Sequence, residues 1–208
     1  MEKIKVTAHI STPIVTGGGY MTLDGLLAAL LFDQLQDVEA AHVAIPVKNT
    51  KGLFHASGAV MEPIDKGRIA FIAALRQQHS INPDLILKNK QGSLHRKFDS
   101  TFTNVLNSYR TLTAPTITWY AEGDADRIRS LLEPVQFIGK RRASGFGQVT
   151  AWDFEPDELD GIEGPFGEPL RPVPRDMFSG DRSMPVVDAA WRPAYWCVEH
   201  RAPCFVPF

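Results

Sequence analysis

The sequence predicts an α+β fold of ferredoxin-like, RRM-like order, β-α-β-β-α-β, with an inserted thumb-like segment and an extended Pro-rich C-terminal segment. Three observations support this. A strand-type alternation at the N-terminus runs through a glycine loop into a leucine-rich helical repeat. A second strand–helix–strand series follows in the middle of the chain. Finally, 44% of the 208 residues are hydrophobic, which is enough to build a core.

The first strand and helix are clear from their periods. Residues 4–10 alternate apolar and polar side chains, as a half-buried strand does. The glycines at 17–19 interrupt this pattern, and leucines then recur at helical spacing. Thr22 is a suitable N-cap and Asp24 suits a first helical turn, so a helix is expected at 22–36.

The middle of the chain has weaker signals. Strands are expected near 43–47 and 53–60, whereas 68–75 is apolar but ambiguous between strand and helix. Residues 80–112 read as an irregular insertion. The β-branched and aromatic residues at 116–120 predict the third core strand.

The last core elements have definite ends. Asp124 caps a short helix, and Pro134 stops it. A strand is expected through 148–154. Seven acidic residues and no Lys or Arg then fall within 153–168, and nine of the 15 prolines lie beyond Glu155. This change of composition predicts an RRM-like domain at 1–154 and an extension at 155–208, with aromatic residues as apolar anchors.

Composition limits the possible functions. The formal net charge is −2 and the pI is about 6.3, so any nucleic-acid binding must be local. No apolar run has the length of a membrane span, and the N-terminus lacks the apolar core of a signal peptide, so a cytoplasmic protein without membrane partners is expected. Two cysteines are too few for a disulfide scaffold.

The most informative motif is the loop at 138–149, which has three glycines, three consecutive cations and no acid. Glycines allow a backbone to approach a ligand closely, and Lys and Arg neutralise phosphate. The spacing fits neither a Walker motif nor a dinucleotide fingerprint. The aromatic ring between two glycines is free either to stack on a base or to pack inward. The candidate residues are Gly139, Lys140, Arg141, Arg142, Ser144, Gly145, Phe146 and Gly147.

Two further segments are candidate anion sites. The triglycine, centred on Gly18, precedes a helix N-terminus, where unpaired amides favour phosphate; the sequence does not show whether it meets the glycine-rich loop. The insertion carries a basic patch that would give salt-sensitive affinity for a nucleic-acid backbone. The residues of this patch are Lys88, Lys90, Arg96 and Lys97.

Catalytic and metal signals are weak. His9 and His55 lie on expected strands and are the best candidates for a base in metal-independent RNA cleavage. Cys197, His200 and Cys204 lack a fourth ligand at convincing spacing. We therefore expect no catalytic residue, no metal site and no cofactor.

The helix at 124–132, the segment 135–138 and the glycine-rich loop resemble the C-terminal part of the RAMP superfamily, the RRM-like proteins of CRISPR–Cas effector complexes. The triglycine and the helix after it extend the resemblance, which covers about residues 1–154. The chain looks most like the small type IV subunit of the "fives" group, which caps the 5′ handle of the guide RNA.

The resemblance implies a non-catalytic, RNA-binding scaffold in antiviral defence. The glycine-rich loop would hold the 5′ handle of the crRNA, with Tyr20 or Phe146 stacking on a base, and the basic patch of the insertion would act as a thumb. The partners would be the crRNA, the large subunit, the backbone RAMP subunit and target DNA near the PAM, which implies a role in DNA interference.

Two other functions stay open from the sequence. Some members of the "fives" group cleave precursor RNA, so an endoribonuclease is the main alternative. The absence of histidine in or beside the glycine-rich loop favours binding over cleavage. A nucleotide-binding enzyme is a further hypothesis, although the sequence contains neither a Walker motif nor a dinucleotide-binding motif.

Overall fold

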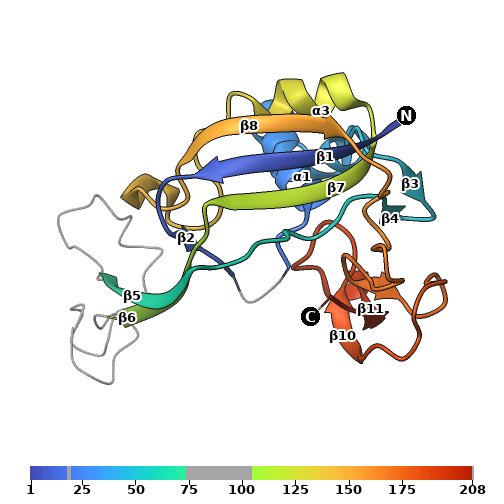
Figure 1. Ribbon diagram of the computed structural model, residues 1–208. Helices are drawn as coiled ribbons and strands as arrows, with labels where there is room; N and C mark the ends of the chain where they lie inside the picture. The colour runs from blue at the N-terminus through green and yellow to red at the C-terminus, as the bar shows by residue number, and fades with distance from the viewer. Residues whose placement is uncertain (18–19, 74–104, 208) are drawn as a thin grey trace, which may run out of the picture.

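The computed structural model describes residues 1–17, 20–73 and 105–207 (Figure 1). The elements in chain order are β1 (Glu2–Ile10), β2 (Ile14–Val15), α1 (Leu23–Leu35), α2 (Val38–Val43), β3 (Asn49–Thr50), β4 (Leu53–Phe54), β5 (Asp65–Ala73), β6 (Val105–Thr113), β7 (Thr116–Gly123), α3 (Ala125–Leu132), the 3-10 turn η2 (Arg142–Ser144), β8 (Val149–Pro156), β9 (Val173–Pro174), β10 (Val186–Ala190), the 3-10 turn η3 (Val198–His200) and β11 (Arg201–Phe205).

The central sheet is antiparallel, with the strand order β7-β1-β8. Its apolar face is covered by α1 and α3, and Figure 1 shows α1 behind the strands. Val6 pairs with Trp119 across β1 and β7, and both side chains are fully buried. The alternation expected for the first strand is therefore confirmed, because Ile4, Val6 and Ala8 of β1 are buried while the residues between them are not.

Residues 47–60 run beside β7 as an irregular edge. Val47, Ala56 and Val60 each make an isolated antiparallel bridge to β7, and only two-residue strands form in between. The strand expected at 43–47 is wrong in its first residue, because Val43 is the last residue of α2. Of the strand expected at 53–60, only the two residues of β4 are in a regular strand. The mixed α+β class is confirmed, whereas the exact β-α-β-β-α-β order is not.

Helix α1 follows its sequence signals closely. The Thr22 hydroxyl accepts a hydrogen bond from the amide of Gly25, and the helix ends before Gln36, which has a φ of 56°. Asp24 lies in the first turn of α1, as expected, but its side chain is completely buried, whereas acidic side chains are usually exposed to solvent. Helix α3 begins at its predicted cap, with Asp124 accepting from the amide of Arg127.

Strands β5 and β6 form a long antiparallel hairpin, and β2 pairs with β6 at its base. Figure 1 shows this hairpin projecting beyond the central sheet. The ambiguous segment 68–75 is thus a strand up to residue 73, and residues 105–112, expected to be irregular, belong to β6. Residues 80–104 of the expected insertion lie outside the described residues.

The C-terminal segment folds onto the rest of the chain. Strands β10, β11 and β9 form a small antiparallel sheet, and Phe205 of β11 packs against Phe178 with the ring centroids 5.2 Å apart. Leu53 of β4 belongs to the same apolar cluster, so this sheet shares its core with the irregular edge. Of the helices in the described ranges, none combines the length and apolar character needed to cross a membrane.

Candidate nucleic-acid interface

The glycine-rich loop is attached to β2 through its backbone. The amide of Lys140 donates to the carbonyl of Val15, and the amide of Gly147 donates to the carbonyl of Pro13, both at 2.9 Å. Gly139 has a φ of 83°, and a Cβ there would lie 2.7 Å from Cγ1 of Ile14. Glycine is therefore needed here so that the loop can lie close to β2.

Arg141 is held by the hairpin. Its guanidinium lies 4.7 Å from the ring centroid of Phe71 and 4.6 Å from that of Tyr109, and it donates to the Tyr109 hydroxyl. Phe146 packs edge-on against Phe71, with the ring centroids 6.2 Å apart. Of the two roles open to Phe146, the structure shows packing. Both side chains connect the glycine-rich loop to the hairpin.

We expect Arg141→Ala to lower the local stability of the hairpin by about 1–2 kcal/mol, because each cation–π contact contributes roughly 0.5–1 kcal/mol. Amide hydrogen exchange in β5 and β6 would measure this loss. The matched control is Arg142→Ala, since the neighbouring side chain is exposed on η2. Equal exchange in the two variants would contradict the role assigned to Arg141.

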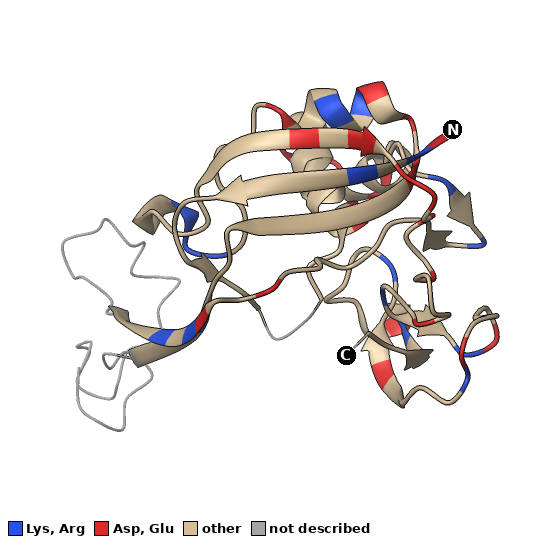
Figure 2. Cartoon of the chain, in the orientation of Figure 1, with Lys and Arg blue, Asp and Glu red and all other residues tan. Residues whose placement is uncertain are grey.

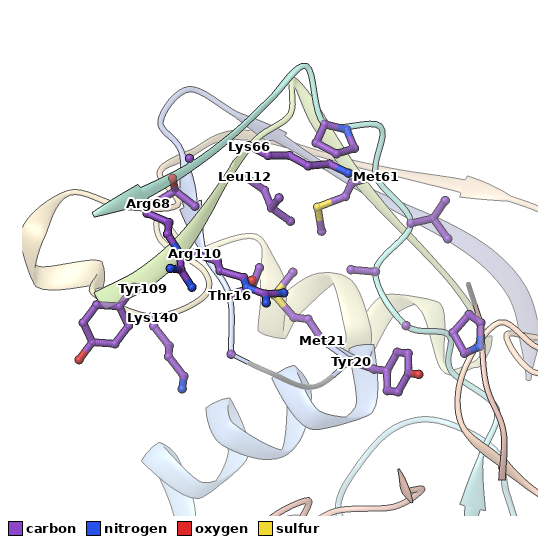
Figure 3. Close-up of a pocket in the computed structure, with 18 of the residues that line it drawn as sticks. Thr16, Tyr20, Met21, Met61, Lys66, Arg68, Tyr109, Arg110, Leu112 and Lys140 are labelled. Carbon is purple, nitrogen blue, oxygen red and sulfur yellow. The ribbon is translucent and has the colours of Figure 1, made fainter. Parts of the chain in front are cut away.

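A groove of about 1560 Å³ lies between the hairpin, the loop before α1 and the segment 58–63 (Figure 3). Its lining carries four cations and no acidic side chain among the described residues. Figure 2 shows Lys and Arg at the base of the hairpin and in the loop beside it. The cations of this basic groove are Lys66, Arg68, Arg110 and Lys140.

Two of these cations oppose each other. Arg68 and Arg110 are direct partners in the β5–β6 ladder, so their side chains leave the hairpin on the same side. Like charges at such positions destabilise a sheet. Both residues are exposed, and neither forms an ion pair within the described part of the chain. An anion in the groove would relieve this repulsion.

The triglycine loop before α1 and the glycine-rich loop at 138–149 meet at this groove. The sequence alone did not show whether these two loops lie close together. A Cβ placed on Gly17 would lie 3.3 Å from Nζ of Lys140. Tyr20 lines the groove and is 40% exposed, and partial burial raises the pKa of its hydroxyl. Met21 and Met61 add apolar surface on the same side. The groove thus combines cations with two aromatic rings, those of Tyr20 and Tyr109, of which Tyr20 is the more exposed.

The sequence-predicted residues fall into five groups. Lys140 and Tyr20 line the groove, while Arg141 and Phe146 contact the hairpin. Gly139 and Gly147 shape the loop, whereas Arg142, Ser144 and Gly145 are exposed on or just after η2. Gly18, Lys88, Lys90, Arg96 and Lys97 lie outside the described residues.

Sequence reasoning missed three of the four groove cations, namely Lys66, Arg68 and Arg110. The first two alternate in a strand-like segment, and recognising the β5–β6 pairing would have placed all three together.

The candidate catalytic histidines lie elsewhere. His9 pairs with Asp153 at 2.6 Å across β1 and β8. His55 bonds to Asp160 at 3.1 Å. Neither side chain lines the basic groove.

Residues 69–207, more than half of the chain, match the family described as CRISPR type IV associated protein Csf3. The chain belongs to this family. The predicted relationship to a type IV CRISPR protein is therefore confirmed. The match includes β6, the glycine-rich loop and the whole described part of the C-terminal segment beyond β8, so this segment belongs to the sequence that defines the Csf3 family.

Among solved structures, this Csf3-family chain is similar to a chain from the cryo-EM structure of the type III-B Cmr-beta complex bound to cognate target RNA. The identity is 9% and the TM-score is 0.43, with 74% of this chain covered. The chain spans 61% of the length of that relative. No curated protein matches the Csf3-family chain significantly.

Proposed function

We propose that this chain is a non-catalytic, RNA-binding subunit of a type IV CRISPR effector complex, and that its basic groove holds the 5′ handle of the crRNA. The observation that carries the proposal is the set of four cations, with no acidic neighbour in the lining, around a groove where both glycine loops meet. Family membership supplies the biological setting.

The groove chemistry favours a single strand. Lys and Arg side chains neutralise phosphates, and Arg does so with two hydrogen bonds. The partly exposed ring of Tyr20 offers a stacking surface to an unpaired base, and Met21 and Met61 provide apolar contact. Unstacked bases are available in single-stranded RNA, where such stacking contributes about 1–3 kcal/mol per base.

The remaining partners follow from the same setting. In a cytoplasmic effector complex, the chain would contact the large subunit and the backbone RAMP subunit, and its groove end would lie near the PAM of target DNA. Trp196 and Val198 are 81% and 76% exposed, respectively, and would serve protein contacts of this kind.

The placement of the histidines supports holding rather than cutting. Metal-independent cleavage needs a base within hydrogen-bond reach of the 2′-hydroxyl. His9 and His55 each bond to a carboxylate, and neither lines the basic groove. The endoribonuclease alternative would therefore need RNA bound at a different surface.

Lys140→Ala tests the proposal directly. We expect weaker binding of a labelled repeat RNA and a salt slope, log K against log salt, that is smaller by about 0.7, because one phosphate contact to a single strand is lost. Fluorescence anisotropy at several salt concentrations measures both. Arg127→Ala is the control, since this exposed cation lies on α3, away from the groove.

Two results would count against the proposal. Equal affinities and slopes for Lys140→Ala and Arg127→Ala would remove the groove as the RNA site. Shortened RNA after incubation with the wild-type chain would reject a non-catalytic role, and loss of that cleavage in His9→Ala or His55→Ala would identify the base.

A further inference from the structure

Three side chains from distant parts of the chain converge beside β4. His55 follows β4, Glu122 lies on β7, and Asp160 belongs to the segment after β8. Nδ1 of His55 lies 3.1 Å from Oδ2 of Asp160 and 3.7 Å from Oε2 of Glu122. One ligand atom from each residue lies within 4.8 Å of the other two, and all three side chains are half-buried.

Each of the three side chains is oriented by a hydrogen bond to another residue, and in His55 and Asp160 this bond is made by the atom that does not face the cluster. Nε2 of His55 lies 2.9 Å from the Thr50 hydroxyl, and the amide of Ile162 donates to Oδ1 of Asp160 at 2.9 Å. Lys48 donates to both oxygens of Glu122, at 3.0 and 2.8 Å. Outer partners of this type fix the tautomer and direction of metal ligands.

The spacing suits a tetrahedral ion. Ligand atoms at 2.0–2.1 Å from zinc lie about 3.4 Å apart, and the two distances from His55 are on either side of this value. The two carboxylates must approach each other by at most about 1.4 Å to complete the triangle. Imidazole and carboxylate are both ordinary zinc ligands, and water takes the open position of such three-residue sites.

The formal charges of the cluster also fit. Two carboxylates and the Lys48 ammonium beside Glu122 leave one net negative charge, which a divalent cation converts to one positive charge.

We propose that His55, Glu122 and Asp160 form a binding site for a divalent cation of the zinc class. The ion would join the beginning of the C-terminal segment to β7 and to the irregular edge of the sheet. This is a site that the sequence did not predict. It is separate from the basic groove, whose lining contains none of the three residues.

The test is a titration of the metal-stripped full-length chain with zinc chloride, followed by calorimetry and thermal unfolding. A Cys197→Ser background removes the accessible thiol, while Cys204 is buried. We expect one ion per chain and a higher melting temperature. Asp160→Asn removes a ligand and should weaken zinc binding by more than the roughly 10–100-fold that loss of an outer partner costs. Asp153→Asn is the matched control, because it breaks the His9–Asp153 pair, which has no third ligand.

The substitution Thr50→Val tests the site while leaving all three proposed metal ligands unchanged. Losing the outer hydrogen bond to His55 should weaken zinc binding by about 10-fold, with little effect on the metal-free melting temperature. The proposal is overturned if the wild-type chain shows no saturable zinc binding. It is also overturned if Asp160→Asn and Asp153→Asn bind zinc with the same affinity.

Discussion

Replacing Arg171 by methionine is expected to lower the free energy of unfolding by about 3–5 kcal/mol, because the change leaves a buried carboxylate without its partner. Arg171 and Asp24 are both completely buried, and their side chains form an ion pair at 3.2 Å. Burial alone lowers the pKa of the guanidinium, but Asp24 and Tyr195 outweigh burial and raise it. The guanidinium is therefore charged inside the protein.

The position of Arg171 explains why the loss should be global. Its guanidinium donates to the carbonyls of Phe54 and Ala56 on the irregular edge of the sheet, and to the carbonyl of Trp191 in the C-terminal segment. It also donates to the hydroxyl of Tyr195, which in turn donates to Asp24 at the start of α1. One side chain thus joins α1, the sheet edge and the C-terminal segment.

Urea unfolding followed by tryptophan fluorescence would measure the effect. Arg201→Met is the matched control, because its ion pair with Asp188 is exposed and should contribute at most about 1 kcal/mol. The double variant Asp24→Leu with Arg171→Met should recover part of the stability, since no charge is left unpaired. Similar losses for Arg171→Met and Arg201→Met would show that Arg171 does not stabilise the fold in this way.

Sequence patterns predicted the elements whose signals are local. The period of β1, the Thr22 cap of α1 and the Asp124 cap of α3 each depend on residues within a few positions of one another. The β5–β6 hairpin was missed because its strands pair across a separation of more than 30 residues and β6 is largely polar. A strand of that composition is defined by its partner more than by its own sequence.

In the candidate site, too, residues with a local sequence signal were predicted and residues brought together by long-range pairing were not. Lys140 and Tyr20 were identified because glycine and charge patterns are visible in the sequence. Arg141, expected to contact RNA, packs between two aromatic rings that only the hairpin pairing brings near it. The proposed zinc site left no sequence signal, since its three ligands are separated by more than 35 residues each and no spacing rule applies.

A single charge reversal in the basic groove should separate RNA binding from stability. In Arg68→Glu, the new carboxylate lies directly opposite Arg110, so the repulsive pair becomes an attractive one. The hairpin should gain about 0.2–1 kcal/mol of stability. RNA affinity should fall by at least about 100-fold, because one phosphate contact is replaced by repulsion and the other cation is occupied by its new partner.

Arg68→Glu is expected to raise the stability of the hairpin and to lower the RNA affinity, and these opposite effects distinguish loss of a phosphate site from a folding defect. A folding defect lowers stability and binding together, whereas loss of a phosphate site lowers binding alone. Anisotropy with the labelled repeat RNA and thermal unfolding would be measured on the same samples. Arg127→Glu on α3 makes the same change of charge outside the groove, which controls for long-range electrostatics. If Arg68→Glu and Arg127→Glu bind RNA equally well, the opposed arginines are not the phosphate site, and the RNA must lie elsewhere on the protein.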